Sequence, residues 1–119
     1  QEWEKAARGT DGRKYPWGNE QVSCRQAVID EGSGESCGGG NRNFKVASKP
    51  LGVSPYGAYD MIGNVEEWTS SQWTGQFPST RRVVRGGSSR FVQRGARASN
   101  RSRNAPDFRF SSFGFRCAQ

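Results

Sequence analysis

The carboxy-terminal part of the chain, residues 85–116, holds side chains that suit contact with another molecule. Its framework is a spaced set of glycines, arginines and turn residues: Gly86, Gly87, Arg97, Arg101, Pro106, Asp107, Arg109, Gly114, Phe115 and Arg116. Between them lie eleven residues of large apolar, small polar or cationic type: Ser89, Arg90, Phe91, Asn100, Ser102, Arg103, Phe108, Phe110, Ser111, Ser112 and Phe113. These eleven follow neither a strand period nor a helix period, so they favour an exposed recognition surface over a core.

Covalent and acid–base chemistry have few candidate residues in this chain. It contains no histidine, and its three cysteines, at positions 24, 37 and 117, lack the close pairing typical of a zinc site. Asp107 and Glu67 are carboxylates of the kind that acid–base chemistry uses, but nothing in the sequence pairs either with a nucleophile. We therefore expect binding rather than catalysis, and acid–base chemistry at these two residues stays open.

Cys24 and Cys37 flank a loop of polar and glycine residues. A disulfide that closes this loop would stabilise the fold by about 3 kcal/mol, because it limits the freedom of the unfolded chain. Three cysteines leave one unpaired, and the residues alone do not say which. Cysteine usage therefore favours an extracellular location only slightly.

Charge is divided unevenly along the chain. Residues 81–116 hold ten arginines and one acid, a balance of +9, whereas residues 1–79 hold eight basic and ten acidic residues, a balance of −2. A cationic half is typical of proteins with an anionic partner such as nucleic acid. We favour the other interpretation, in which many of these arginines bind carboxylates and backbone carbonyls within the fold.

Composition indicates one ordered, loop-rich domain over residues 1–119. Hydrophobic residues make up 32% of the chain, while 16 Gly and 5 Pro break up long elements. Four Trp, three Tyr and seven Phe compensate, since each aromatic ring buries a large area. We expect the tryptophans to pack in the core rather than to serve as ligand platforms. No apolar run is long enough to span a membrane.

Local patterns predict only short secondary-structure elements. Glu2–Arg8 combines strong helix formers with a Glu4–Arg8 pair, so it predicts a helix that ends at Gly9. Short strands are predicted for Val46–Val53, interrupted by Pro50, for Arg82–Arg85, stopped by a sharp turn at Gly86-Gly87, and for Phe113–Cys117.

Five motifs carry a resemblance to a known family. They are EWEKAARG (2–9), YPWGNE (15–20), SPYGAYDMIGNVEEW (54–68), RVVRGGS (82–88) and GFRCA (114–118). In content and order they resemble the formylglycine-generating enzyme, or sulfatase-modifying factor, family. The resemblance implies an α+β, C-type lectin-like fold with short antiparallel strands, few helices and many loops. It also implies that this chain corresponds to the carboxy-terminal half of the family's domain. Two alternatives stay open for the amino-terminal half: it lies on another chain, which would then be a partner, or it has been lost.

The GNVEEW motif offers hard oxygen ligands, which calcium prefers. Asn64 and Glu67 lie close together in the sequence, and a tight turn exposes backbone carbonyls. The resemblance implies a structural calcium ion held by Asn64, the carbonyls near Gly63 and Val65, and Glu67. A polar turn without metal is the alternative.

The catalytic metals of the family lack their ligands in this chain. The formylglycine-generating enzyme uses copper held by two cysteine thiolates shortly after its GGS motif, and thiolates suit cuprous copper. Residues 88–100 contain no cysteine. Related iron enzymes need histidines, and this chain has none. We therefore expect neither copper nor iron.

The tail also resembles a non-enzymatic branch with the same fold, the variable proteins of diversity-generating retroelements. In these proteins a fixed scaffold displays residues that mutagenesis directed to adenines has diversified. The spacing of GGS, the arginines, NAPD and GFR, with Phe and Ser gathered around Arg109, fits this pattern. The resemblance implies that the eleven intervening residues form a ligand-binding face.

Three functions from different classes follow from these observations. The first is a receptor-like domain that binds a protein or cell-surface ligand, on a cell surface, outside the cell or on a phage virion. The second is an oxidoreductase of the sulfatase-modifying type that has lost its copper cysteines. The third is a nucleic-acid-binding domain that uses the arginine-rich tail. We favour the first.

Overall fold

A computed structural model of the protein describes residues 1–40, 42–75 and 78–118. Its first element is helix α1 (Glu2–Arg8). Acidic residues in the first turn of α1 and basic residues in its last turn suit the helix dipole. An ion pair of 2.7 Å links Glu4 to Arg8 one turn later. The helix ends at Gly9, whose φ of 69° favours glycine. The predicted helix is thus confirmed at both ends.

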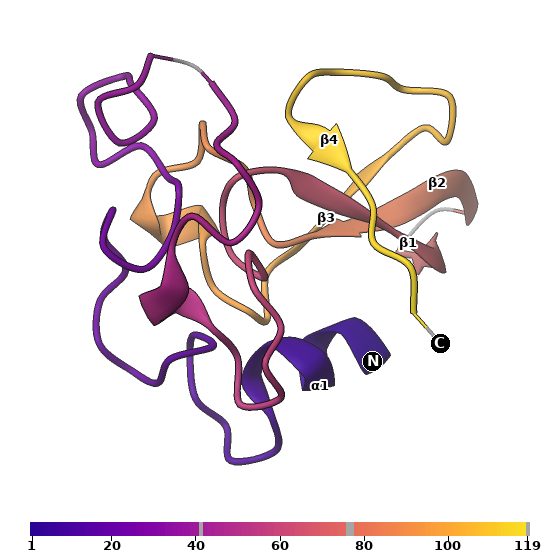
Figure 1. Cartoon of the computed structure of the whole chain (residues 1–119). Helices are drawn as coiled ribbons and strands as arrows, with labels where there is room; N and C mark the ends of the chain where they lie inside the picture. Colours follow the sequence, from indigo (N-terminus) through magenta and orange to yellow (C-terminus); the bar gives the residue numbers. More distant parts are fainter. Residues whose placement is uncertain (41, 76–77, 119) are drawn as a thin grey trace.

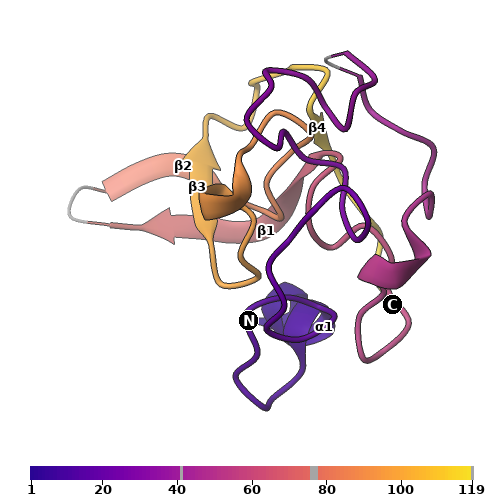
Figure 2. The same cartoon turned by 90° about the vertical axis from the view of Figure 1, so that its left-hand side faces the viewer.

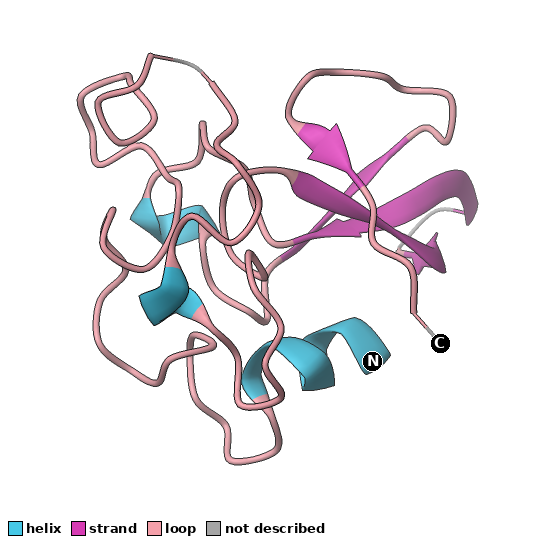
Figure 3. Cartoon of the chain, viewed as in Figure 1, coloured by secondary structure: helices cyan, strands magenta, loops and turns pink. Residues whose placement is uncertain are grey.

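Four strands form one sheet in the order β3-β2-β1-β4 (Figures 1 and 3). β1 (Glu66–Thr74) runs antiparallel to β2 (Pro78–Arg85), and β2 runs antiparallel to β3 (Arg101–Asn104). β4 (Phe113–Gly114) joins the other side of β1. The expected short antiparallel strands are present, and this last pairing is parallel, so the sheet is mixed.

Two of the three strand predictions need correction. Arg82–Arg85 lies in β2 as predicted, but only the first two residues of Phe113–Cys117 are paired, in β4. The strand predicted at Val46–Val53 is wrong, because this segment forms a turn followed by a 3₁₀ helix, Pro50–Gly52. Proline cannot donate to a strand ladder, and the positive φ of Ala47, 60°, takes the chain out of extended geometry.

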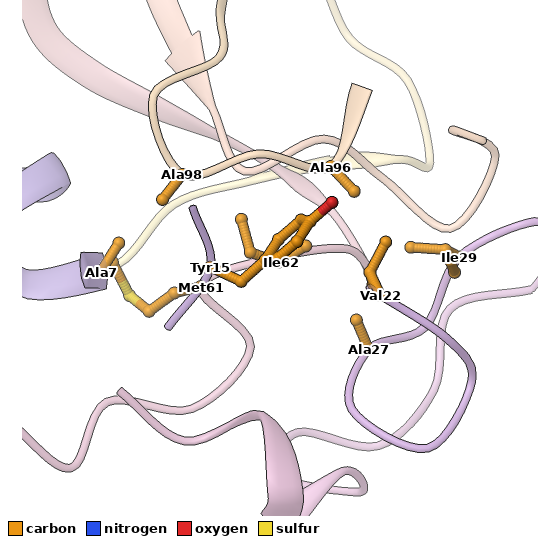
Figure 4. Packing of buried hydrophobic residues seen from close by; sticks show 9 residues of the cluster. All are labelled: Ala7, Tyr15, Val22, Ala27, Ile29, Met61, Ile62, Ala96 and Ala98. Atoms are coloured by element: carbon orange, nitrogen blue, oxygen red, sulfur yellow. The ribbon is translucent and has the colours of Figure 1, made fainter. Parts of the chain in front are cut away.

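The hydrophobic core lies among the loops beside the sheet (Figure 4). Its buried members come from α1, from the loops over residues 15–29 and 61–62, and from the segment before β3: Ala7, Tyr15, Val22, Ala27, Ile29, Met61, Ile62, Ala96 and Ala98. Trp3, Trp17 and Cys24 pack against this cluster partly buried. The structure joins Cys24 to Cys37 in a disulfide, which leaves Cys117 as the exposed free cysteine of the described chain.

Two glycines connect this core to the sheet. Gly63, just before β1, has a φ of 77°, and a Cβ there would collide with the Val28 carbonyl. Gly86, just after β2, has a φ of 90° and leaves room for the Trp3 ring. The Gly63 N–H donates to the Gly86 carbonyl at 2.9 Å. The predicted sharp turn at Gly86 is confirmed, and it brings the ends of β1 and β2 onto the core.

Seen from the side (Figure 2), strands β1 and β2 project away from the loop-rich part of the molecule. A second 3₁₀ helix, Gln93–Gly95, lies in the connection between β2 and β3. Within the residues that the structure describes, no helix has the length and apolar character needed to cross a membrane.

Candidate binding surface

Arg85, at the end of β2, ties three parts of the fold together. One of its guanidinium nitrogens donates to the carbonyls of residues 98, 99 and 100, at 3.4, 3.1 and 3.1 Å. The other donates to Glu4 of α1 at 2.8 Å. Burial raises the pKa of Glu4, but the hydrogen bonds from Arg85 and Arg8 outweigh that effect and hold the pKa below its usual value. The Arg85 side chain is only 8% exposed, so its role is structural.

Glu67, on β1, is the second junction of this kind. Its carboxylate accepts a hydrogen bond from the Trp3 indole at 2.7 Å and two from Arg116, at 2.7 and 2.5 Å. Arg116 also donates to the Tyr59 carbonyl at 3.0 Å. The hydrogen bonds that Arg116 donates to Glu67 raise the pKa of Arg116, as expected for a cation beside a carboxylate. The interpretation that arginines bind acids within the fold is confirmed at Arg85 and Arg116. We call the set Trp3, Glu4, Glu67, Arg85 and Arg116 the ionic frame.

The residues predicted to hold calcium have other partners. The Asn64 amide accepts from the Phe44 N–H at 2.9 Å and donates to the Phe44 carbonyl at 3.1 Å. The Asn64 carbonyl accepts from the Ser89 N–H, and Glu67 faces the Arg116 guanidinium. Donors and a cation therefore occupy the oxygens of Asn64 and Glu67, so the contacts of these two residues do not fit the predicted calcium site of Asn64, Val65 and Glu67. Calcium binding stays a prediction, and we derive no function from it.

Glu66, at the start of β1, is buried beneath the carboxy-terminal loop. Its N–H donates to the Ser112 carbonyl at 2.8 Å, which brings the loop against the strand. Burial of the carboxyl group raises the pKa of Glu66 to about 6. Its charge is therefore unfavourable in the folded state at neutral pH.

The structure divides the eleven predicted face residues by exposure. Six are exposed: Arg90, Asn100, Arg103, Phe108, Phe110 and Ser111. Three are half-buried: Phe91, Ser102 and Phe113. Two are buried: Ser89 and Ser112.

The expected exposure of Ser89 and Ser112 is wrong, because both serines join the loops to the body of the fold. The Ser89 carbonyl accepts from the Ser36 hydroxyl at 2.9 Å, while the Ser112 carbonyl holds the start of β1. Phe91 and Asn100 also serve the fold. Phe91 packs where a side chain on Gly95 would collide with it, and the Asn100 amide donates to the Gly95 carbonyl at 2.9 Å.

The loop between β3 and β4 carries a cluster of rings beside one cation, which we call the Phe–Arg cluster. It comprises Arg90, Phe108, Phe110 and Phe113. The centroid of the Phe108 ring lies 6.4 Å from that of Phe110 and 5.2 Å from that of Phe113. The Arg90 guanidinium carbon lies 4.8 Å from the Phe110 centroid. Phe108 and Phe110 are 42% and 49% exposed, so the cluster presents a large apolar area to solvent beside a positive charge.

Hydrogen bonds give this loop a defined shape. The Phe108 N–H donates to the carbonyl of Ala105 at 3.0 Å, and the Phe113 N–H donates to the carbonyl of Phe110 at 3.1 Å. The Asn43 amide donates to the Ser111 carbonyl, which fastens the loop to a distant part of the chain. The Phe113 ring lies 5.5 Å from Trp68 on β1 and anchors the cluster at its base.

Arg103 does not join the Phe–Arg cluster. It lies on β3, where its guanidinium carbon is 4.8 Å from the Trp73 ring centroid, and Arg101 contacts the same ring at 5.0 Å. We call Trp73, Arg101 and Arg103 the Arg–Trp cluster. A Cβ on Gly75 would collide with the Trp73 indole, so a glycine at this position leaves room for the ring. The expectation that tryptophans pack in the core fits Trp3 and Trp17 better than Trp73.

A cavity of about 640 Å³ lies between α1 and the sheet. Its walls include the rings of Trp3 and Trp68 and the cations Arg85, Arg101 and Arg116. Sequence patterns gave no sign of this cavity, because its walls come from both ends of the chain and from three strands. Arg85 and Arg116 already form ion pairs within the ionic frame. Arg101, the third arginine in the cavity wall, takes part in none of the four ion pairs of the described residues.

Known proteins resemble this chain over nearly its whole length. It is 37% identical over 132 residues to the inactive C-alpha-formylglycine-generating enzyme 2 of Bos taurus. The aligned region covers 99% of this chain and 42% of that protein. It is 35% identical over 139 residues to the formylglycine-generating enzyme of Mus musculus, covering 98% of this chain and 37% of that protein. The chain thus spans about two fifths of the length of these relatives.

The structure is also similar to that of Treponema denticola variable protein 1. The TM-score is 0.70 at 28% identity, over 96% of this chain and 43% of that one. The fold is therefore of the formylglycine-generating enzyme type, a C-type lectin-like fold, as the motifs implied. The family model for the sulfatase-modifying factor enzyme 1-like domain matches residues 1–119. The chain belongs to this family.

Proposed function

We propose that this protein is a non-enzymatic binding domain whose ligand contacts the Phe–Arg cluster. The observation that carries the proposal is the exposure of Phe108 and Phe110 next to Arg90, on a loop that hydrogen bonds hold in place. Exposed apolar patches of this kind mark interaction surfaces in soluble proteins. Phenylalanine and arginine supply large contact areas, and few rotamers are lost when a ring is already packed.

The residues that stabilise the fold are different from those of the Phe–Arg cluster, and this separation supports the proposal. The core residues and the ionic frame lie outside the Phe–Arg cluster, so the exposed cluster residues contribute little to holding the fold together. The anchoring ring, Phe113, is the exception, because it packs on Trp68. A scaffold of this kind tolerates changes at exposed loop positions, which a diversified binding protein requires.

The similarity to a variable protein supports diversification of this surface. The test is the coding DNA. We expect a nearby reverse transcriptase gene and a near-identical template repeat, in which adenines fall in the codons for exposed residues such as Arg90, Phe108 and Phe110. Adenine-directed substitutions spread equally over the codons of Arg85 and Glu67 would contradict the proposal, because these residues hold the fold.

A direct binding experiment tests the surface itself. A display library randomised at Arg90, Phe108, Phe110 and Ser111 is selected against one defined protein, such as lysozyme. We expect folded clones with micromolar or better affinity, and reversion of the four positions abolishes binding. A matched library randomised at Arg13, Lys14, Asn19 and Glu20 serves as the control. Equal yields from both libraries would contradict a special role for the Phe–Arg cluster.

A catalytic role of the family's copper type finds no ligand pair in the described chain. Two of its cysteines form a disulfide, and Cys117 is exposed and alone. Copper titration tests this alternative. Stoichiometric, tight binding of cuprous ion to the oxidised protein would favour the oxidoreductase and count against a purely binding function.

A further inference from the structure

The Arg–Trp cluster occupies a part of the sheet that the proposed ligand surface does not use. Arg101 and Arg103 are two residues apart on β3, so both side chains leave the same face of the strand. Both guanidinium groups lie within about 5 Å of the Trp73 ring centroid, at the 5.0 and 4.8 Å given above. β3 stands at the end of the strand order, and the described sheet has no strand beyond it.

The two arginines have no carboxylate partner among the described residues. The ion pairs in that part of the chain involve other arginines: Arg8, Arg13, Arg85 and Arg116. Arg101 and Arg103 are both exposed and both lie beside the indole, so N–H groups of the two guanidinium groups are available to an anion. Stacking on an aromatic ring holds a guanidinium in place without using its donors.

We propose that the Arg–Trp cluster binds the phosphodiester backbone of single-stranded nucleic acid. Residues two apart on a strand are separated by roughly 7 Å, a spacing that suits two anions along one polymer chain. Trp73 is half-buried, and its indole ring holds both guanidinium groups beside it at the surface. Basic grooves with aromatic platforms are the usual way in which proteins hold single strands without reading their sequence.

The surrounding charge supports the same ligand. Residues 81–116 have a balance of +9, and their one acid, Asp107, lies in the loop between β3 and β4 rather than on the sheet. Glu4 and Glu67 pair with Arg85 and Arg116, but the chain as a whole keeps a net charge of +7 that attracts polyanions, and the cluster gives that attraction a fixed contact point. This inference does not depend on the function proposed for the Phe–Arg cluster.

The test is a titration of a fluorescein-labelled oligodeoxythymidylate of about 12 nucleotides, followed by anisotropy at several salt concentrations. We expect Arg101→Gln/Arg103→Gln to weaken binding roughly tenfold or more, since two charge-assisted hydrogen bonds are lost. The slope of log K against log salt should fall in magnitude by about 1.4, because each phosphate contact on a single strand contributes about 0.7.

The matched control removes the same charge elsewhere. Arg94→Gln/Arg97→Gln changes two exposed arginines outside the cluster and should weaken binding less than about threefold, through the general field alone. Trp73→Leu keeps every charge and should weaken binding roughly threefold, since the ring no longer holds the guanidinium groups. Thermal melts show whether each variant is folded. If the Arg101 change unfolds the protein, Arg103→Gln alone should still lower the slope by about 0.7.

Three results would overturn the proposal. The first is equal weakening by the two double variants, which would mean diffuse attraction without a site. The second is binding of heparin but not of the oligonucleotide, which would assign the cluster to a sulfated polysaccharide. The third is an absence of oligonucleotide binding at low salt. Phe108→Ala/Phe110→Ala should leave oligonucleotide binding unchanged, so this experiment and the tests of the Phe–Arg cluster can fail independently.

Discussion

The ionic frame and the Phe–Arg cluster use the same residue types for opposite purposes. In the frame, Arg85 lies beside the Trp3 ring, at 5.6 Å from its centroid, but it also binds Glu4 and three carbonyls. In the cluster, Arg90 lies over the Phe110 ring at 4.8 Å and has no carboxylate beside it in the described structure. An arginine stacked on an aromatic ring therefore does not by itself indicate either structure or function.

The partners of the guanidinium group make the difference. A buried arginine needs acceptors for its donors, since an unpaired buried charge is costly. Four acceptors surround Arg85, and its side chain is 8% exposed. Arg90 is exposed and keeps its donors in water, where a ligand can reach them. Mutations in the two regions should therefore change different properties of the protein.

The largest effect is expected for Arg85→Ala. This change leaves Glu4 without its buried partner and removes donors from three carbonyls, so the free energy of unfolding should fall by about 3–5 kcal/mol. Thermal or urea unfolding measures it. Arg82→Ala on the same strand is the control, because the Arg82 side chain is exposed and donates to the Ser70 carbonyl. Equal losses in the two variants would contradict the structural role of the ionic frame.

A smaller loss is expected for Glu67→Gln. The shape is kept, but Arg116 loses its opposite charge and the Trp3 indole loses a charged acceptor, at a cost of about 2 kcal/mol. Unfolding by urea at neutral pH measures the change. A Glu67→Gln variant as stable as the parent protein would mean that this junction is not needed.

Glu66 should make stability depend on pH in the opposite direction to Glu4, whose pKa is lowered in the folded state. Its folded-state pKa of about 6 lies above the usual value for glutamate, so the folded state binds the Glu66 proton more tightly than the unfolded state does. The contribution of this proton to the free energy of unfolding is complete below the unfolded pKa and is lost as the pH rises through about 6. Glu66→Gln should remove this dependence and raise the free energy of unfolding at pH 8 by on the order of 1 kcal/mol. Melting curves of both proteins between pH 4 and pH 8, roughly the span that contains both pKa values, measure the effect. A variant less stable than the parent at pH 8 would contradict it.

The smallest effect on stability is expected for Arg90→Ala. The loss of one exposed contact with the Phe110 ring should cost at most about 1 kcal/mol. Affinity for a ligand selected on the Phe–Arg cluster should fall at least tenfold, because Arg is a frequent hot-spot residue. If Arg90→Ala lowers the free energy of unfolding but not the affinity, Arg90 holds the fold together rather than binding a ligand, which contradicts the proposed difference between the two regions.

Local signals in the sequence predicted the helix and the glycine turns, and the division of charge along the chain predicted that arginines bind acids within the fold. Gly9 and Gly86 have positive φ angles that glycine adopts most readily, so the glycines in the sequence mark where the helix ends and where the chain turns. Local pattern failed at Val46–Val53, where Pro50 and the turn at Ala47 outweigh the strand-forming valines. It also failed at Ser89 and Ser112, whose burial depends on contacts with residues far away in the chain.

The Arg–Trp cluster could not be predicted for a similar reason. Trp73, Arg101 and Arg103 meet only because β1 and β3 both pair with β2 in a particular register, with irregular pairing along β1. Gly75 adds a local condition, since any side chain there would displace the indole. Strand order and register depend on the whole fold, and neither is encoded in a short window.

The comparison between frame and surface is tested most directly by one melting experiment. Arg90, Phe108, Phe110 and Ser111 are replaced together by alanine, and the melting temperature is measured beside that of the parent protein. If these residues serve a ligand, the melting temperature should change by less than about 5 °C, which corresponds to roughly 1 kcal/mol in a domain of this size. A fall as large as that of Arg85→Ala would mean that the exposed rings hold the fold together, and the binding surface proposed for this protein would be wrong.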